Sequence, residues 1–126
     1  MNRERVTILR NYLSQLVPNA FNMGNWGDDI GGIHRCGTPA CIAGWSERLF
    51  NDWRHDQEKL SYVHSAAELL DIDLHTGWAL FMPTLQDSLG VKYEEVTPHH
   101  AAAMLDRLLA QGTVTMADWR AVMGRG

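Results

Sequence analysis

The sequence is poor in cysteine and has no long apolar run. Two cysteines in 126 residues are too few for the disulfide framework of a small secreted domain. No apolar stretch approaches the roughly 18 residues that a membrane-spanning helix needs. The first residues, MNRERVTILRNYL, are charged and amphipathic, which is not the pattern of a signal peptide. We therefore expect a cytoplasmic protein with reduced thiols and no membrane attachment.

Positive charge is also scarce. The 11 lysines and arginines are outnumbered by 15 aspartates and glutamates, which gives a formal net charge of −4 at pH 7. This balance argues against a basic nucleic-acid footprint over the whole surface. A helix-turn-helix over residues 62–70 and 74–81 is the best DNA-binding candidate, but its second helix, LHTGWALF, has no arginine or asparagine to contact bases. We expect no sequence-specific DNA binding.

Several motifs that identify enzymes are missing as well. The chain has no G-x-x-x-x-G-K-[ST] phosphate loop and no G-x-G-x-x-G dinucleotide fingerprint. It also lacks the H-E-x-x-H motif of zinc proteases and the G-x-S-x-G motif of serine hydrolases. These absences exclude the enzyme classes that a short motif would reveal.

What the sequence does have is helical periodicity. Capping residues mark helix starts at Thr38, Asp73, Thr97 and Thr115, and proline follows two of them. Hydrophobic residues make up 45% of the chain, which is enough for one core in a domain of this length. The pattern predicts a single all-α domain, residues 1–126, of five to six short helices. The expected helices cover residues 3–17, 39–53, 62–70, 74–81, 99–110 and 116–123.

A long Gly/Asn/Asp-rich loop follows the first expected helix. Residues 18–37 read PNAFNMGNWGDDIGGIHRCG and leave room for a small hairpin. A loop of this length in a small domain is usually functional. We expect its apolar side chains, Phe21, Met23 and Trp26, to hold the loop against the core. Farther along, residues 84–96 give no clear helical or strand pattern.

The densest polar cluster surrounds Cys41. This residue follows the expected helix start at Thr38, where the partial positive charge of a helix N-terminus lowers the pKa of a cysteine. With His34 as base and Asp28 or Asp29 to orient it, Cys41 would be the nucleophile of a cysteine-dependent hydrolase or transferase. This enzyme is the first alternative. The favoured interpretation is that Cys41 packs as a small apolar side chain, because free cysteine is among the most buried residue types.

The same segment offers a zinc site. His34, Cys36 and Cys41 are ligand types that zinc takes. Their spacing, H-x-C-x4-C, is not that of a standard zinc knuckle, and only one such cysteine pair occurs. A small structural zinc-binding domain is therefore a second alternative, whereas the leading hypothesis includes no cofactor.

Residues 36–45, CGTPACIAGW, carry a motif of the form C-G-T-x-A-C-I-A-G-W. An F-x-M-x-x-W segment precedes it, from Phe21 to Trp26, and L-F-x-P follows, from Leu80 to Pro83. In these features the chain resembles a family of small bacterial and phage proteins for which no activity is established. The resemblance implies a bacterial cytoplasm, often with phage or other mobile DNA. Small acidic proteins in that setting frequently bind and inhibit a host complex, which is an analogy of setting and not of mechanism.

The leading hypothesis is a non-enzymatic protein-interaction module. Its partner would be a host protein or nucleoprotein complex, such as a nucleoprotein defence machine with a basic channel, which the module would inhibit. The net charge of −4 would favour association with a basic surface. One or two of the five tryptophans should stay exposed as interface anchors. The predicted contacts lie in the long loop: Trp26, Asp28, Asp29 and Arg35.

Overall fold

The structure is a computed structural model, and it describes residues 1–21, 23, 41–50 and 62–124. Within these ranges every regular element is a helix, which confirms the all-α prediction. The elements are α1 (Arg3–Ser14), η1 (Pro18–Ala20), α2 (Ile42–Phe50), α3 (Tyr62–Leu70), α4 (Leu74–Phe81), α5 (Leu85–Leu89), η4 (Tyr93–Glu95), α6 (Pro98–Gln111) and α7 (Met116–Val122), where η marks a single 3-10 turn. None of the described helices is long and apolar enough to cross a membrane.

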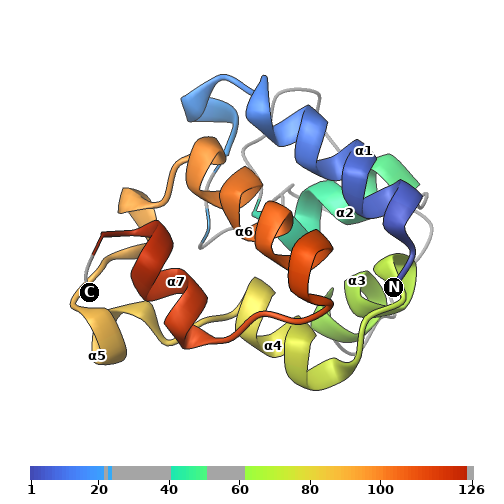
Figure 1. The fold of residues 1–126 in the computed structure, drawn as a ribbon. Helices are drawn as coiled ribbons and strands as arrows, with labels where there is room; N and C mark the ends of the chain where they lie inside the picture. Colours follow the sequence, from blue (N-terminus) through green and yellow to red (C-terminus); the bar gives the residue numbers. More distant parts are fainter. Residues whose placement is uncertain (22, 24–40, 51–61, 125–126) are drawn as a thin grey trace.

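The helix α6 runs through the middle of the molecule, with α1 on one side and α4 and α7 on the other (Figure 1). α1 packs along α6, and Arg10 donates two hydrogen bonds to the Asp106 carboxylate, at 2.8 and 3.2 Å. On the other side of the core, α3 packs against both α2 and α4. All seven helices contribute apolar side chains to one core. Its large, fully buried side chains include Leu9, Leu13, Ile42, Leu70, Phe81, Met104 and Trp119.

Local capping chemistry places several helix ends where the sequence predicts them. The side chains of Asp73, Thr97 and Thr115 each accept a hydrogen bond from a backbone N–H in the first turn of the following helix. Gly112 ends α6 in the left-handed conformation, with φ of 81°. These four predictions are confirmed. The expected start at Thr38 lies outside the described residues.

Three parts of the fold differ from the prediction. α1 ends at Ser14 instead of Val17, because a residue before proline is disfavoured in the helical conformation and Val17 is extended. A seventh helix among the described residues, α5, forms within residues 84–96, which have no clear helical or strand pattern. It buries Leu85 and ends at Gly90, whose φ is 68°. α2 begins at Ile42, so Cys41 lies before the helix and not within it, and residues 42–47 are buried on all sides of the helix.

The long loop is described only near its start. Phe21 and Met23 are 6% and 3% exposed, which confirms that they hold this segment against the core. Trp26 and any hairpin lie outside the described residues.

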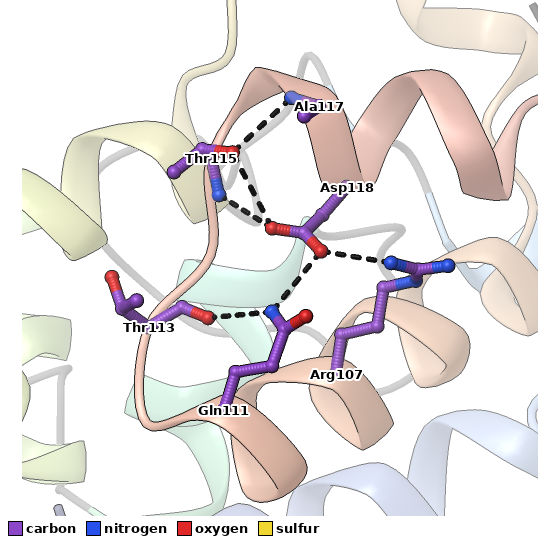
Figure 2. A network of polar contacts seen from close by, with 6 residues as sticks. All are labelled: Arg107, Gln111, Thr113, Thr115, Ala117 and Asp118. Carbon is purple, nitrogen blue, oxygen red and sulfur yellow. Dashed lines mark hydrogen bonds and ion pairs between the residues drawn. The ribbon is translucent and has the colours of Figure 1, made fainter. Parts of the chain in front are cut away.

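A buried carboxylate, Asp118, joins α7 to α6 (Figure 2). Its Oδ2 accepts the N–H of Thr115 at 2.8 Å and completes a capping box at the start of α7. Its Oδ1 accepts hydrogen bonds from Arg107 at 2.9 Å and from Gln111 at 3.1 Å, both on α6. Burial opposes the ionisation of Asp118, but these donors outweigh it, so the pKa of Asp118 lies below its ordinary value.

We predict that Asp118→Ala lowers the free energy of unfolding by about 2 kcal/mol, because it removes a cap and leaves its donors unpaired. The pKa of Asp118 is lower in the folded protein than in the unfolded chain, where it is about 3.9. The stabilisation by its carboxylate is therefore complete above pH about 3.9, and it is lost as the pH falls through the pKa of Asp118 in the folded protein. Urea denaturation at pH 7 and below pH 4 measures both effects. Asp106→Ala, in the exposed ion pair with Arg10, is the control and should cost much less. Equal losses in the two variants would contradict the account.

His100 takes the place that glutamate or glutamine usually has in the capping box of α6. The backbone N–H of Thr97 donates to Nδ1 of His100 at 3.0 Å, and the N–H of His100 donates to Oγ1 of Thr97 at 3.2 Å. Burial and the nearby charge of His99 lower the pKa of His100. A protonated Nδ1 has no lone pair to accept with, so the box needs the neutral imidazole.

We predict a pH-dependent loss of stability from this box. Because the pKa of His100 is lowered on folding, its contribution is complete above the unfolded pKa of about 6.5 and disappears as the pH falls through the folded pKa. Between pH 7 and pH 5 the free energy of unfolding of the wild type should fall by up to about 1 kcal/mol more than that of His100→Gln. The glutamine amide keeps the capping box at both pH values. Thermal unfolding of the two proteins, with His99→Gln as control, measures the difference. An identical pH dependence in wild type and His100→Gln would contradict the assignment.

Candidate functional site

Most of the site predicted from the sequence lies outside the described residues. Cys41 is the one member that the structure describes. The other six residues, whose roles stay predictions, are Trp26, Asp28, Asp29, His34, Arg35 and Cys36.

Cys41 is buried directly before α2. Its side chain is 2% exposed, and its Sγ accepts a hydrogen bond from the backbone N–H of Gly44 at 3.4 Å. Burial raises the pKa of Cys41 to about 11 and outweighs the hydrogen bonds from the start of the helix. The lowered pKa that a nucleophile needs is therefore not found, and the structure favours the packing role.

We predict that Cys41 is nearly inert towards alkylation in the folded protein. A pKa of about 11 instead of 9.0 leaves about 100-fold less thiolate at neutral pH, and burial blocks access to the sulfur. The measurement is the rate of iodoacetamide labelling in a Cys36→Ser variant, so that Cys41 is the only thiol, with and without denaturant. Labelling of the folded variant at the rate of an exposed thiol would restore the enzyme alternative.

Residues 1–21, 23, 41–50 and 62–124 contain no group of three or more His, Cys, Asp or Glu side chains placed to hold a metal ion. Two of the three proposed zinc ligands, His34 and Cys36, lie outside these ranges, so the zinc alternative stays a prediction.

Exposed apolar side chains lie along α4. Leu74 and Trp78, one helical turn apart, are 40% and 44% exposed, and Met82, the residue directly after the helix, is 39% exposed. The opposite side of α4 is buried in the core through Gly77, Leu80 and Phe81, among others. A helix that is apolar all round is normally buried all round. We call Leu74, Trp78 and Met82 the α4 stripe.

Three contacts fix the rotation of α4 and so turn the stripe outward. Gly77 lies so close to α3 that a Cβ there would stand 3.2 Å from the Cβ of Ala67. The buried Thr76 hydroxyl lies 2.6 Å from Oδ1 of Asp73 and 2.7 Å from Oγ1 of Thr113, in the connection between α6 and α7. The hydroxyl of Thr76 also lowers the pKa of Asp73, which keeps this carboxylate charged.

The third contact comes from α7. The indole N–H of Trp119 donates to the carbonyl oxygen of Ala79 on α4, at 2.8 Å. Trp119 is fully buried, so this hydrogen bond holds α4 and α7 together inside the core. α4 is thus attached to α3 on one flank and to the α6–α7 unit on the other, which leaves only the stripe side facing out.

Trp78 is also held in place by an aromatic neighbour. Its ring meets the ring of His64 on α3 edge to face, with centroids 6.4 Å apart and an interplanar angle of 86°. A restrained, half-exposed tryptophan loses little conformational freedom on binding, which is typical of an interface anchor. The expectation of an exposed tryptophan is thus met by Trp78, whereas Trp45 and Trp119 are 7% and 0% exposed.

A cavity of about 600 Å3 opens beyond the end of the stripe. It lies between α5 and η4, and its lining begins at Pro83, the residue after Met82. The hydroxyl of Tyr93 donates to the carbonyl oxygen of Pro83 at 2.7 Å and fixes one wall to the other. The cavity therefore begins one residue after the stripe in the sequence.

The α4 stripe is not among the binding residues predicted from the sequence. Its signal was present, because LHTGWALF followed by Met82 places apolar residues on both sides of the expected helix. Comparison with known proteins adds no further assignment. No family model, no curated protein and no solved structure matches this chain. The resemblance carried by residues 36–45 therefore stays a prediction.

Proposed function

We propose that the protein is a non-enzymatic protein-interaction module that binds its partner through the α4 stripe. The observation that carries this proposal is the exposure of Leu74 and Trp78 on a helix whose other side is in the core, and of Met82 directly after it. Contiguous apolar surface of this kind is typical of binding sites. Burying it against a partner would contribute about 25 cal/mol for each Å2 removed from water.

The enzyme alternative has less support. A cysteine nucleophile needs an accessible thiolate, whereas Cys41 is 2% exposed and has a raised pKa. The α4 stripe has the opposite character, since it is accessible and offers contact area instead of a reactive group.

The partner proposed from the sequence is a host protein or nucleoprotein complex in a bacterial cell, which this protein would inhibit by occupying part of its surface. The formal net charge of −4 supports a partner with a basic surface, and salt should then weaken the complex. The loop residues Trp26, Asp28, Asp29 and Arg35 remain a proposed second contact.

We predict that Trp78→Ala weakens partner binding at least about tenfold, because truncation of a central aromatic anchor commonly costs more than 1.4 kcal/mol. Folding should change little, since Trp78 is 44% exposed and alanine favours a helix. The measurement is a quantitative pull-down from a bacterial lysate with the full chain as bait, followed by titration of the retained partner.

Two variants act as controls for this experiment. Ile8→Ala removes an apolar side chain that is also 44% exposed but lies on α1, on the other side of α6 from α4 (Figure 1). It should leave binding unchanged. Trp26→Ala tests the loop contact separately. A stoichiometric partner that binds wild type and Trp78→Ala equally well would contradict the proposal.

A further inference from the structure

Carboxylates gather at the N-terminal end of the α4 stripe. Asp73 caps α4 directly before Leu74, and Asp71 lies two residues earlier in the turn from α3. The side chain of Asp71 is 82% exposed, although its carboxylate lies 3.5 Å from the N-terminal amino group. Glu68 is exposed one helical turn after His64 on α3, on the side that reaches Trp78. Two cations lie at the same end, the N-terminal amino group and Arg5, whose guanidinium donates to the carbonyl oxygen of Leu69 at 2.9 Å. Three carboxylates against two cations leave this end with a net negative charge.

The cavity end of the stripe is acidic as well. Asp87 and Glu94 line the cavity together with one cation, Lys92. Glu95 is exposed beside them, and its Oε2 accepts the backbone N–H of Lys92 at 2.7 Å. A second cation, Arg120, is exposed on α7, which packs against α5. The six carboxylates at the two ends thus outnumber the four cations beside them, which are the N-terminal amino group, Arg5, Lys92 and Arg120.

We infer that the occupant of the α4 stripe is a basic amphipathic helix of a partner protein, an inference that rests on the proposed function. Apolar residues at four-residue spacing on α4 match the anchors along one face of a second helix. Lysines and arginines beside those anchors would meet the carboxylates at both ends of the stripe.

The same charges argue against two other occupants. A second copy of this chain, related by a two-fold axis, would bring the same acidic patch onto itself. An anionic lipid surface would be repelled by the carboxylates around the stripe. A basic helix is the occupant for which both the apolar spacing and the charge are complementary.

The test uses two synthetic helical peptides of about 18 residues, or five turns. Both carry leucines at the same i, i+4 and i+8 positions; one has lysines on its polar face and the other has glutamates. Binding of the fluorescently labelled peptides to the full-length protein is measured by anisotropy. The lysine peptide should bind at least about tenfold more tightly than the glutamate peptide. The difference should shrink between about 0.1 and 1 M salt, since the Debye length falls from about 10 to 3 Å.

Variants of the protein locate the site. Trp78→Ala should weaken binding of the lysine peptide at least about tenfold, and Ile8→Ala should not. Glu68→Lys should weaken it as well, whereas Glu4→Lys, on α1, is a charge-matched control that should have little effect. Equal binding of both peptides, with loss in Trp78→Ala, would overturn the basic partner and leave the proposed function standing.

The remaining outcomes are equally distinct. If the lysine peptide fails to bind but Trp78 is needed to retain a partner from the lysate, this inference falls and the proposed function stands. If Trp78→Ala changes neither peptide binding nor the retention of a partner, both this inference and the proposed function are contradicted. If sedimentation shows dimers that Trp78→Ala abolishes, the occupant of the stripe is a second copy of this chain and not a basic helix. If the protein binds phosphatidylserine vesicles and needs Trp78 to do so, the occupant is a membrane.

Discussion

The orientation of α4 is the constraint on which the proposed binding surface depends. Its helix is apolar on both sides, so hydrophobicity alone does not decide which side enters the core. Three contacts determine the side that is buried. Gly77 packs closely against Ala67, and the Thr76 hydroxyl lies between Asp73 and Thr113. The third contact is the hydrogen bond from Trp119 to Ala79. A rotation about the axis of α4 would break all of these contacts together. The exposed stripe is therefore a consequence of polar and steric contacts inside the core.

Polar contacts also connect the helices that surround this unit. Asp118 links the start of α7 to Arg107 and Gln111 on α6, so α7 and its Trp119 are held in one position. The connection between α6 and α7 supplies Thr113, which contacts Thr76 at the other end of the same arrangement. α4 thus contacts two helices that are joined to each other by hydrogen bonds. A surface held in this way can bind without first becoming ordered, which favours affinity.

The features that the sequence predicted correctly depend on neighbouring residues. The caps at Asp73, Thr97 and Thr115 act within three residues, so their chemistry is visible in the chain. α5 was missed because it has only five residues and is held by the burial of Leu85 and by Gly90. The raised pKa of Cys41 has a related cause. The helix N-terminus is a local effect that the sequence shows, whereas the stronger effect of burial comes from distant parts of the fold.

The α4 stripe is most directly tested by 19F NMR of protein labelled with 5-fluorotryptophan. The chain has five tryptophans, and the resonance of Trp78 is assigned as the one that disappears in Trp78→Phe. A dissolved paramagnetic agent should broaden this resonance in the free protein, and addition of the lysine peptide or of the natural partner should protect it. A Trp78 resonance already protected in the free monomer, or still broadened in a saturated complex, would contradict the stripe as the binding surface.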